Sequence, residues 1–280
     1  MLFRLTGALT RAALVVFLIT VPSIMLPGGT LDSAQIVAIV AVFAGLFTVV
    51  EYCASSPSLI EFRDARPFNR VRFVTVFATV LSLSMIFRGY EQSSAITDFF
   101  HSVGSLIGGL TDFPFSPVRL MVAILPQETT AQIGEQLWDA VGLSYVISLS
   151  SVVWFMLLLQ LKRWPRPNET FNVWINLPTF APVSGGDVVK RMRRDGRINM
   201  LLGILLPFLI PMIVKLADLL GVSLNLSDPQ TLIWTVTAWA FLPAGVFMRG
   251  IALNRIAKLI QLQRKRAHEK AESEGMLPAW

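Results

Sequence analysis

The sequence is poor in the residues that catalysis and metal binding use most often. It has one cysteine, Cys53, and two histidines among its 280 residues. A single cysteine excludes a disulfide within the chain, and His101 and His268 stand far apart without a cysteine cluster, so no zinc or haem motif is present. The sequence also lacks a G-x-S-x-G elbow, an H-E-x-x-H pair and a phosphate-binding loop of the G-x-x-x-x-G-K type. We therefore predict no metal, no cofactor and no enzymatic activity.

Charged residues are also scarce. They make up 15% of the chain, against roughly 25% in a typical soluble domain. Hydrophobic residues reach 54%, and the mean hydropathy is +0.61. The apolar residues fall into stretches close to the roughly 20 residues that a helix needs to cross a bilayer. We predict an all-α, polytopic integral membrane protein with six transmembrane helices. The predicted spans are 12–26, 34–50, 71–87, 140–161, 198–220 and 230–248.

Lysine and arginine lie almost entirely on one side of these spans. The first, third, fifth and seventh polar segments and their borders hold 21 of the 24 basic residues, whereas the 18 acidic residues split evenly. Cytoplasmic loops retain Lys and Arg, and Asp and Glu contribute little to orientation. We therefore expect both termini in the cytoplasm of a bacterial-type inner membrane. Basic loops there gain about 1 kcal/mol per Lys or Arg from anionic headgroups, so the pI of about 9.9 requires no nucleic acid as a partner.

Local signals mark several helix ends. Arginines precede the first stretch as in a signal peptide, but Pro27 and Asp32 stand where small residues would form a cleavage site, so we expect an uncleaved helix. Asp32 or Ser33 can cap the second helix, and Ser227 or Asp228 can cap the last one. Ala34, Ala38, Ala41 and Gly45 share one face, which lets a neighbouring helix approach closely. Pro207 and Pro211 predict a kink in the fifth span.

Two sets of polar residues inside the spans are candidates for a transport path or a packing face. Hydroxyls recur at helical spacing in the third and fourth spans, and a cation and an acid follow at i, i+3 in the fifth. Hydroxyls in lipid form interhelical hydrogen bonds or line a wetted path, and ionisable residues inside a span are functional candidates. The candidates are Thr75, Thr79, Ser82, Ser144, Ser148, Ser151, Lys215 and Asp218.

Two aromatic-rich cytoplasmic segments are candidates for docking a partner. In 61–72 opposite charges alternate with phenylalanines, and the segment 164–182 combines four prolines with Trp and Phe. For the first segment we favour a position in the membrane interface, with the aromatics toward the lipid and the charges outward, and docking is the alternative. Glu51, at the border of the second span, is expected to pair with Arg63, Arg66 or Arg70. The candidate docking residues are Phe62, Arg63, Arg66, Phe68, Trp174 and Phe180.

The segment 91–139 is the one long insert on the non-cytoplasmic side. Apolar residues at helical spacing predict one short helix around 99–110, and Ser116 with Pro117 opens another over 118–125. Both are too short to span a bilayer. Two arrangements are compatible with this pattern: interfacial helices lying on the leaflet, which we favour, or a re-entrant hairpin shielded by protein or water. His101 is expected at the interface and not in a proton relay.

The chain divides into a transmembrane domain over 1–266, with a basic cytoplasmic helical extension over 249–266, and a polar C-terminal tail over 267–280. A turn at 184–187 is expected to cap a basic helix over 188–194. The pattern predicts a non-enzymatic accessory, assembly or scaffold protein, with anionic lipids and other membrane subunits as partners. The alternative is a channel or small-solute transporter that uses the third to fifth spans and the insert, although no internal repeat supports a carrier.

Overall fold

The computed structural model describes residues 2–63, 66–124, 131–162, 164–165, 172–178, 180, 187–221 and 228–274. Side chains are described for these residues except 2–4, 66, 131–133 and 174. This part of the chain is helical and contains no strand. The helices are α1 (Leu2–Met25), α2 (Leu31–Cys53), α3 (Arg66–Glu91), α4 (Ala95–Thr111), α5 (Pro117–Val122), α6 (Ala131–Leu161), α7 (Val173–Asn176), α8 (Val188–Leu219) and α9 (Pro229–Ser273).

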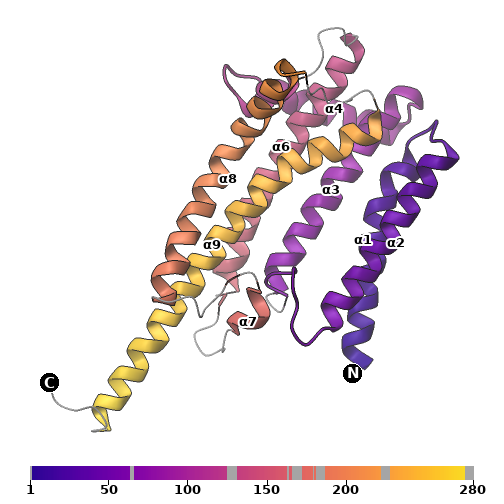
Figure 1. Cartoon of the computed structure of the whole chain (residues 1–280). Coiled ribbons are helices and arrows are strands. Elements are labelled where there is room, and N and C mark those ends of the chain that lie inside the picture. Colours follow the sequence, from indigo (N-terminus) through magenta and orange to yellow (C-terminus); the bar gives the residue numbers. More distant parts are fainter. Residues whose placement is uncertain are drawn as a thin grey trace.

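Six of these helices are long and apolar enough to cross a membrane: α1, α2, α3, α6, α8 and α9. This confirms the predicted all-helical fold with six candidate membrane-spanning helices. The start of α1, the short helix α7 and the end of α9 lie at one end of the bundle, and α4 lies at the other (Figure 1). Chain entry and exit at the same end follow from an even number of long helices.

The six long helices extend beyond the predicted spans. The expected basic helix over 188–194 is the first part of α8, and the expected extension over 249–266 continues α9 without interruption. Residues 267–273, the first part of the predicted polar tail, are helical, because α9 continues to Ser273. This segment has no proline or glycine, and Lys265 with Glu269 and Lys270 with Glu274 form ion pairs of 3.6 Å at i, i+4, a spacing that supports helix formation. Residues 275–280 lie outside the described part.

Polar side chains cap the long helices. Asp228 accepts a hydrogen bond of 2.7 Å from the N–H of Thr231 and caps α9, as predicted. Asp187 caps α8, also as predicted, and the hydrogen bond from Arg264 lowers the pKa of its carboxyl. The expected cap of α2, Asp32 or Ser33, is wrong. The cap is Thr30, whose side chain accepts a hydrogen bond from the N–H of Ser33. Ser227 and residues 184–186 of the expected turn lie outside the described part.

The helices form two groups. The α1–α2 hairpin is one, and it packs mainly through α1 against α3. The other contains α3, α6, α8 and α9, with α9 packed along α8 and against α6 and α3. Of the predicted small-residue face of α2, Ala41 and Gly45 are buried, and a Cβ on Gly45 would lie 2.7 Å from Val16 of α1. Ala34 and Ala38 are exposed.

The contact between α8 and α9 is close because glycines remove side chains at the crossing. A Cβ on Gly203 would lie 2.6 Å from Cβ of Phe247, and one on Gly250 would lie 2.6 Å from the carbonyl oxygen of Gly196. The helix α8 continues through both prolines that the sequence placed in it. Since Pro211 has no N–H to donate to the carbonyl of Pro207, that carbonyl is available, and the buried indole of Trp239 on α9 donates to it at 3.0 Å.

The insert places α4 and α5 against different neighbours. The helix α4 packs on α3 and α6, whereas α5 packs on α6 and α8. The α4–α6 crossing is tight, since a Cβ on Gly142 would lie 2.6 Å from Cα of Gly108. Ile96, Phe99, Leu106 and Leu110 of α4 remain exposed. The insert thus contains two short helices held on different long helices, with several apolar side chains of α4 left exposed.

Candidate functional site

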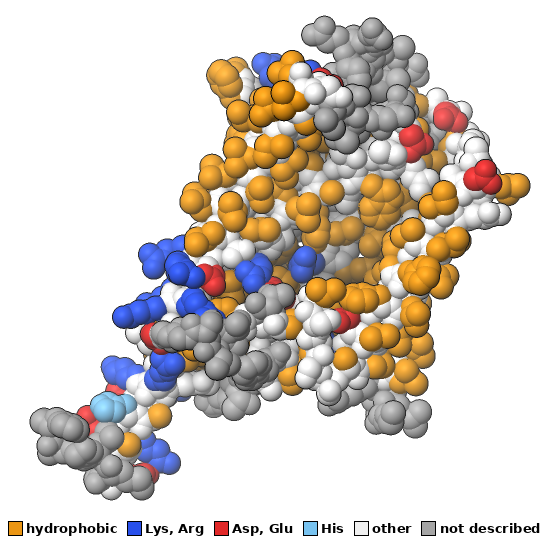
Figure 2. Space-filling model, viewed as in Figure 1, with side chains coloured by type: hydrophobic (Ala, Val, Ile, Leu, Met, Phe, Trp, Pro, Cys, Tyr) orange, Lys and Arg blue, Asp and Glu red, His pale blue; other side chains and the backbone are white. Residues whose placement is uncertain are grey.

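A cavity of about 880 Å³ lies between the α1–α2 hairpin and the pair formed by α3 and α9. It is near the end of the bundle that carries α7, and Lys and Arg atoms are visible low in the space between the α8–α9 face and the α1–α2 hairpin (Figure 2). We call it the arginine cavity. Its lining residues include Arg11, Arg63, Arg70, Arg72, Arg249 and Glu61, the polar Thr10, Thr48, Tyr52 and Asn69, and the apolar Leu14, Val15, Phe68, Phe73, Val74, Leu242 and Val246.

The segment between α2 and α3, which contributes Leu59, Ile60 and Glu61 to the lining of this cavity, is folded onto Glu51. The Glu51 carboxylate is buried and accepts hydrogen bonds from the N–H groups of Ser58, Leu59 and Ile60 at 3.0–3.2 Å, and from the Ser58 hydroxyl at 2.5 Å. The sequence predicted an arginine partner, but these contacts show a carboxylate that organises a loop. Several N–H donors satisfy a buried carboxylate at least as well as one cation does.

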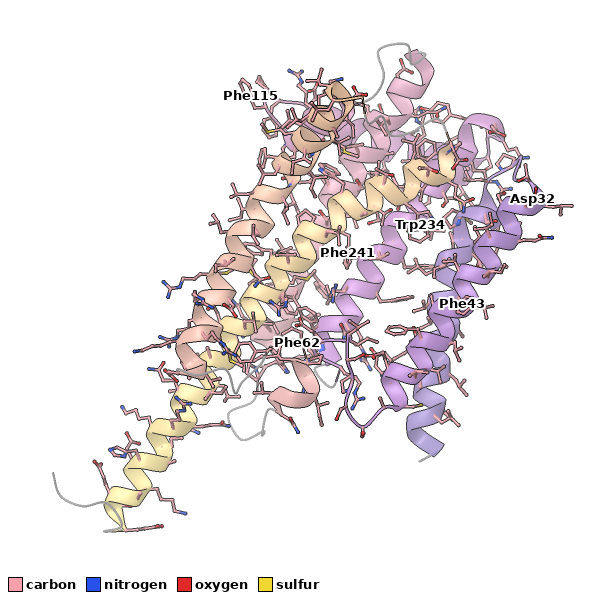
Figure 3. All side chains as sticks on the ribbon, viewed as in Figure 1. Asp32, Phe43, Phe62, Phe115, Trp234 and Phe241 are labelled. Carbon is pink, nitrogen blue, oxygen red and sulfur yellow. The ribbon has the colours of Figure 1, made fainter. Side chains whose placement is uncertain are left out.

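Phe62 anchors the same segment in the protein core. Its φ of 54° is in the left-handed region, uncommon for a bulky residue. Asn69 donates to the carbonyl of Phe62 at 3.1 Å, the Phe62 N–H donates to Asn176 at 2.7 Å, and the ring lies 4.3 Å from that of Phe68 between centroids. Figure 3 shows Phe62 beneath α9, at the level of α7.

The predicted docking surface is therefore wrong for its phenylalanines. Phe62, Phe68 and Phe180 are buried in the protein's own core, together with residues of α3, α6, α8 and α9, so their rings are not free to contact a partner. Arg63 lines the arginine cavity and donates to the carbonyls of Ala54 and Glu51 at 2.6 and 3.2 Å. The side chains of the other two candidates, Arg66 and Trp174, lie outside the described part of the structure.

Arg249 of α9 ties this loop to the helix bundle. Its guanidinium donates to both carboxylate oxygens of Glu61, at 2.6 and 2.8 Å. The bidentate geometry is the strongest that an arginine and a carboxylate form. Both side chains are largely buried, with 26% of Arg249 and 12% of Glu61 exposed. The pair fixes one wall of the cavity.

Arg72 is an arginine of the cavity with an unsatisfied hydrogen-bond donor. Its Nε is buried and has no hydrogen-bond partner among the described residues. The guanidinium lies 5.3 Å from the ring of Phe68 and 5.4 Å from that of Phe241, and Gly245 on α9 leaves room for it, at 3.7 Å from a Cβ placed there. Aromatic faces attract a guanidinium, but they accept no in-plane hydrogen bond from it. An anion in the cavity would complete its coordination.

The cavity as a whole is strongly cationic at its lower end and apolar above. Five arginines and one glutamate line it, which gives a formal charge of +4. Arg11 of α1 lies 4.6 Å from the ring of Tyr52 and donates to the carbonyl of Gly7 at 2.6 Å. Clustered like charges in a cleft focus a positive potential. The site suits an anionic group attached to an apolar body.

The hydroxyls predicted to form a path or a packing face do not line this cavity. Thr75, Thr79, Ser82, Ser144, Ser148 and Ser151 are all buried on α3 and α6, two helices that pack against each other. Thr75, Thr79, Ser144, Ser148 and Ser151 donate to carbonyls of their own helices at 2.6–2.9 Å. A hydroxyl satisfied in this way needs no water. Lys215 and Asp218 of α8 pair locally at 3.4 Å with about 40% of each side chain exposed.

A second polar cluster lies at the end of the bundle that carries α4. His101 of α4 approaches the buried carboxylate of Asp139 on α6, with 2.8 Å between Nδ1 and Oδ2, and the hydroxyl of Tyr90 on α3 lies 3.4 Å from the same nitrogen. These contacts join three helices. About half of the His101 side chain is exposed, whereas that of Asp139 is 7% exposed.

Comparison with known proteins gives no relative for this chain. No protein-family model, no curated protein and no solved structure matches it. Within the described part of the chain, no group of three His, Cys, Asp or Glu could hold a metal ion. The arginine cavity is therefore the main basis for assigning a function.

The cavity was not predicted from the sequence, because the arginines were assigned to sidedness, to pairing with Glu51 and to docking a partner. Arg11, Arg72 and Arg249 come from three helices that are far apart in sequence. One signal was present: Arg72 falls within the predicted span 71–87, and a charged residue inside a span marks a functional candidate by default.

Proposed function

We propose that this is a multi-pass protein of the cytoplasmic membrane, with both termini in the cytoplasm, that acts by binding and not by catalysis. Its role is that of an accessory or scaffold subunit of a membrane complex, and the arginine cavity binds an anionic group as part of that role. The one-sided distribution of Lys and Arg supports the orientation. The arginine cavity then faces the cytoplasmic leaflet.

The arrangement of polar groups is the observation that carries this proposal. In the described helices, the candidate hydroxyls are buried on α3 and α6, and the clustered arginines line a cavity to which the segment between α2 and α3 also contributes. A site that concentrates charge at one membrane face, with no acid or histidine cluster beside it among the described residues, is suited to holding a ligand.

The channel or transporter alternative requires a polar route through the helices. Its candidate residues on α3 and α6 donate to their own backbone, and the apolar Phe73, Val74 and Leu242 line the arginine cavity beyond its cationic end. Both observations favour binding over passage. We keep the accessory role as the proposed function.

Extraction in a mild detergent tests the accessory role. We expect the tagged protein to elute with other membrane proteins in a complex well above its own mass of 31.0 kDa, and to keep those partners through a second purification step. Cross-linking before extraction serves as the control for complexes lost in detergent. A single monodisperse monomer in both preparations would contradict the accessory role.

Thiol labelling tests the orientation. In a C53S background, the sequence contains no other cysteine, so one cysteine at a time can be placed at exposed Gln92, after α3, or at exposed Ser273, at the end of α9. We expect a membrane-impermeant maleimide to label Q92C in intact cells after outer-membrane permeabilisation, and S273C only after lysis. Labelling of S273C in intact cells would overturn the orientation and the cytoplasmic placement of the cavity.

A further inference from the structure

We infer that the ligand of the arginine cavity is an anionic phospholipid of the adjacent leaflet, with its phosphate at Arg72 and an acyl chain between α1 and the α3–α9 pair. This inference rests on the proposed function, because it identifies the anionic group that the cavity binds. It also specifies which residues contact each part of the lipid.

The phosphate position follows from hydrogen-bonding capacity. A guanidinium carries five N–H donors in a fixed plane, a geometry that matches phosphate oxygens. Arg72 has a buried Nε without a partner among the described residues, whereas Arg249 is engaged by Glu61. Glu61 is an acidic neighbour of Arg72, but its carboxylate already accepts two hydrogen bonds from Arg249. Phosphate oxygens would supply the acceptor that the Nε of Arg72 lacks, with Arg11 on the α1 side of the cavity.

Arg11 of α1 and Arg72 of α3 both line the arginine cavity. Their guanidiniums are therefore available to the same anionic group, although they belong to different helices.

The apolar lining accounts for the rest of the ligand. Leu14 and Val15 of α1 and Phe73 and Val74 of α3 line the cavity, and Leu242 and Val246 line it from α9. Leu242 and Val74 are more than half exposed, so this part of the cavity is accessible from the side of the bundle. Figure 3 shows Phe241 on the α9 side and Phe43 on the outer α2 side of this region. A volume of about 880 Å³ is within the range of ligand sites and exceeds what a phosphate group needs.

A free phosphate or a small phosphate ester would use only the cationic end. Such a ligand would leave the apolar lining in contact with water or empty, while a phospholipid covers it at roughly 25 cal/mol per Å² of apolar surface. A zwitterionic lipid carries its own cation, which the arginines repel. An anionic phospholipid is the chemistry that satisfies both parts.

Native mass spectrometry of the purified full-length protein tests the inference. The probes are palmitoyl-oleoyl phosphatidylglycerol, palmitoyl-oleoyl phosphatidylcholine and glycerol 3-phosphate. We expect one phosphatidylglycerol to be retained with an affinity at least about ten-fold above that for phosphatidylcholine, and an R72Q variant to lose about ten-fold in that affinity, since hydrogen bonds to charged groups contribute roughly 1.5–3 kcal/mol. R72K is expected to recover part of the loss through its charge.

Two further variants make the result specific. R194Q removes an exposed arginine of α8 that lies outside the cavity, and it should leave phosphatidylglycerol binding unchanged. L242W fills the apolar part from a half-exposed position and should weaken phosphatidylglycerol without affecting glycerol 3-phosphate. Circular dichroism and elution volume establish that each variant is folded, and L242W tests the inference even where R72Q does not fold.

The outcomes separate the inference from the proposed function. Binding of glycerol 3-phosphate as tight as that of phosphatidylglycerol, lost in R72Q, would overturn the lipid assignment and leave an anion-binding cavity. Equal binding of both phospholipids, or an R72Q affinity equal to that of the unaltered protein, would also overturn it. Absence of arginine-dependent binding of any of the three probes would reject the anion site of the proposed function itself.

Discussion

Replacing Arg249 with methionine is expected to lower the free energy of unfolding by about 3–5 kcal/mol, the cost of breaking a largely buried ion pair by removing one partner. The carboxylate of Glu61 would remain, with 12% of its side chain exposed, and would lose two donors at 2.6 and 2.8 Å. The segment between α2 and α3 would then lose its ion pair with α9 and keep its packing through Phe62. Equilibrium unfolding in mixed micelles by titration with SDS measures this change.

The matched control is the double variant E61Q/R249M. Removing both charges leaves no isolated ion, and replacing a whole buried pair with neutral groups is often close to neutral. We therefore expect the double variant to be more stable than R249M alone. If the two single substitutions prove additive in the double variant, Glu61 and Arg249 do not stabilise each other, and the pair does not fix the wall of the cavity.

Replacing Gly250 with valine should separate α8 from α9 and cost about 3 kcal/mol, at the upper end of the range for overpacking. A Cβ there would lie 2.6 Å from the carbonyl oxygen of Gly196 and 2.8 Å from the backbone nitrogen of Met200. Backbone atoms cannot rotate away as a side chain does, so the helices must move apart. The midpoint of thermal unfolding in detergent is the measurement.

Gly134 offers the control for helix propensity. It lies in α6, and no atom comes within 4 Å of a Cβ placed on it. G134A is therefore expected to be neutral or slightly stabilising, since alanine favours a helix over glycine by roughly 1 kcal/mol. A G250V protein that melts at the same temperature as the unaltered one would show that α8 and α9 do not depend on this close approach.

The long helices could be predicted because their signal is local. A run of apolar residues such as 34–50 suits a membrane-spanning helix whatever lies around it, and α2 contains that run in full. Asp228 and Asp187 were predicted as caps for the same reason, because the donors lie two or three residues along the chain. Thr30 was missed because Asp32 and Ser33 have equal capping chemistry, and only the path of the chain selects among them.

The loop between α2 and α3 shows where local reasoning fails. The alternation of charge and phenylalanine in 61–72 has the pattern of a surface segment, yet Phe62 and Phe68 are fully or almost fully buried. Their position depends on α6, α8 and α9, which come 60 or more residues later in the sequence. The predicted partners of Glu51 were three arginines close to it in sequence. Its carboxylate instead accepts hydrogen bonds from the N–H groups of Ser58, Leu59 and Ile60, which the turn of the loop places beside it.

The number of long apolar helices, several of their ends and the uneven distribution of positive charge could be read from the chain, because each depends on residues close together in it. The meeting of Arg11, Arg72 and Arg249 in one cavity, and the burial of the hydroxyls of α3 and α6 with hydrogen bonds inside their own helices, became evident from the packing of the helices. The physical reason is that hydropathy and capping energies are local, whereas a binding site depends on which faces of distant helices pack together. Glycines at the α8–α9 contact and the Glu61–Arg249 pair fix those faces.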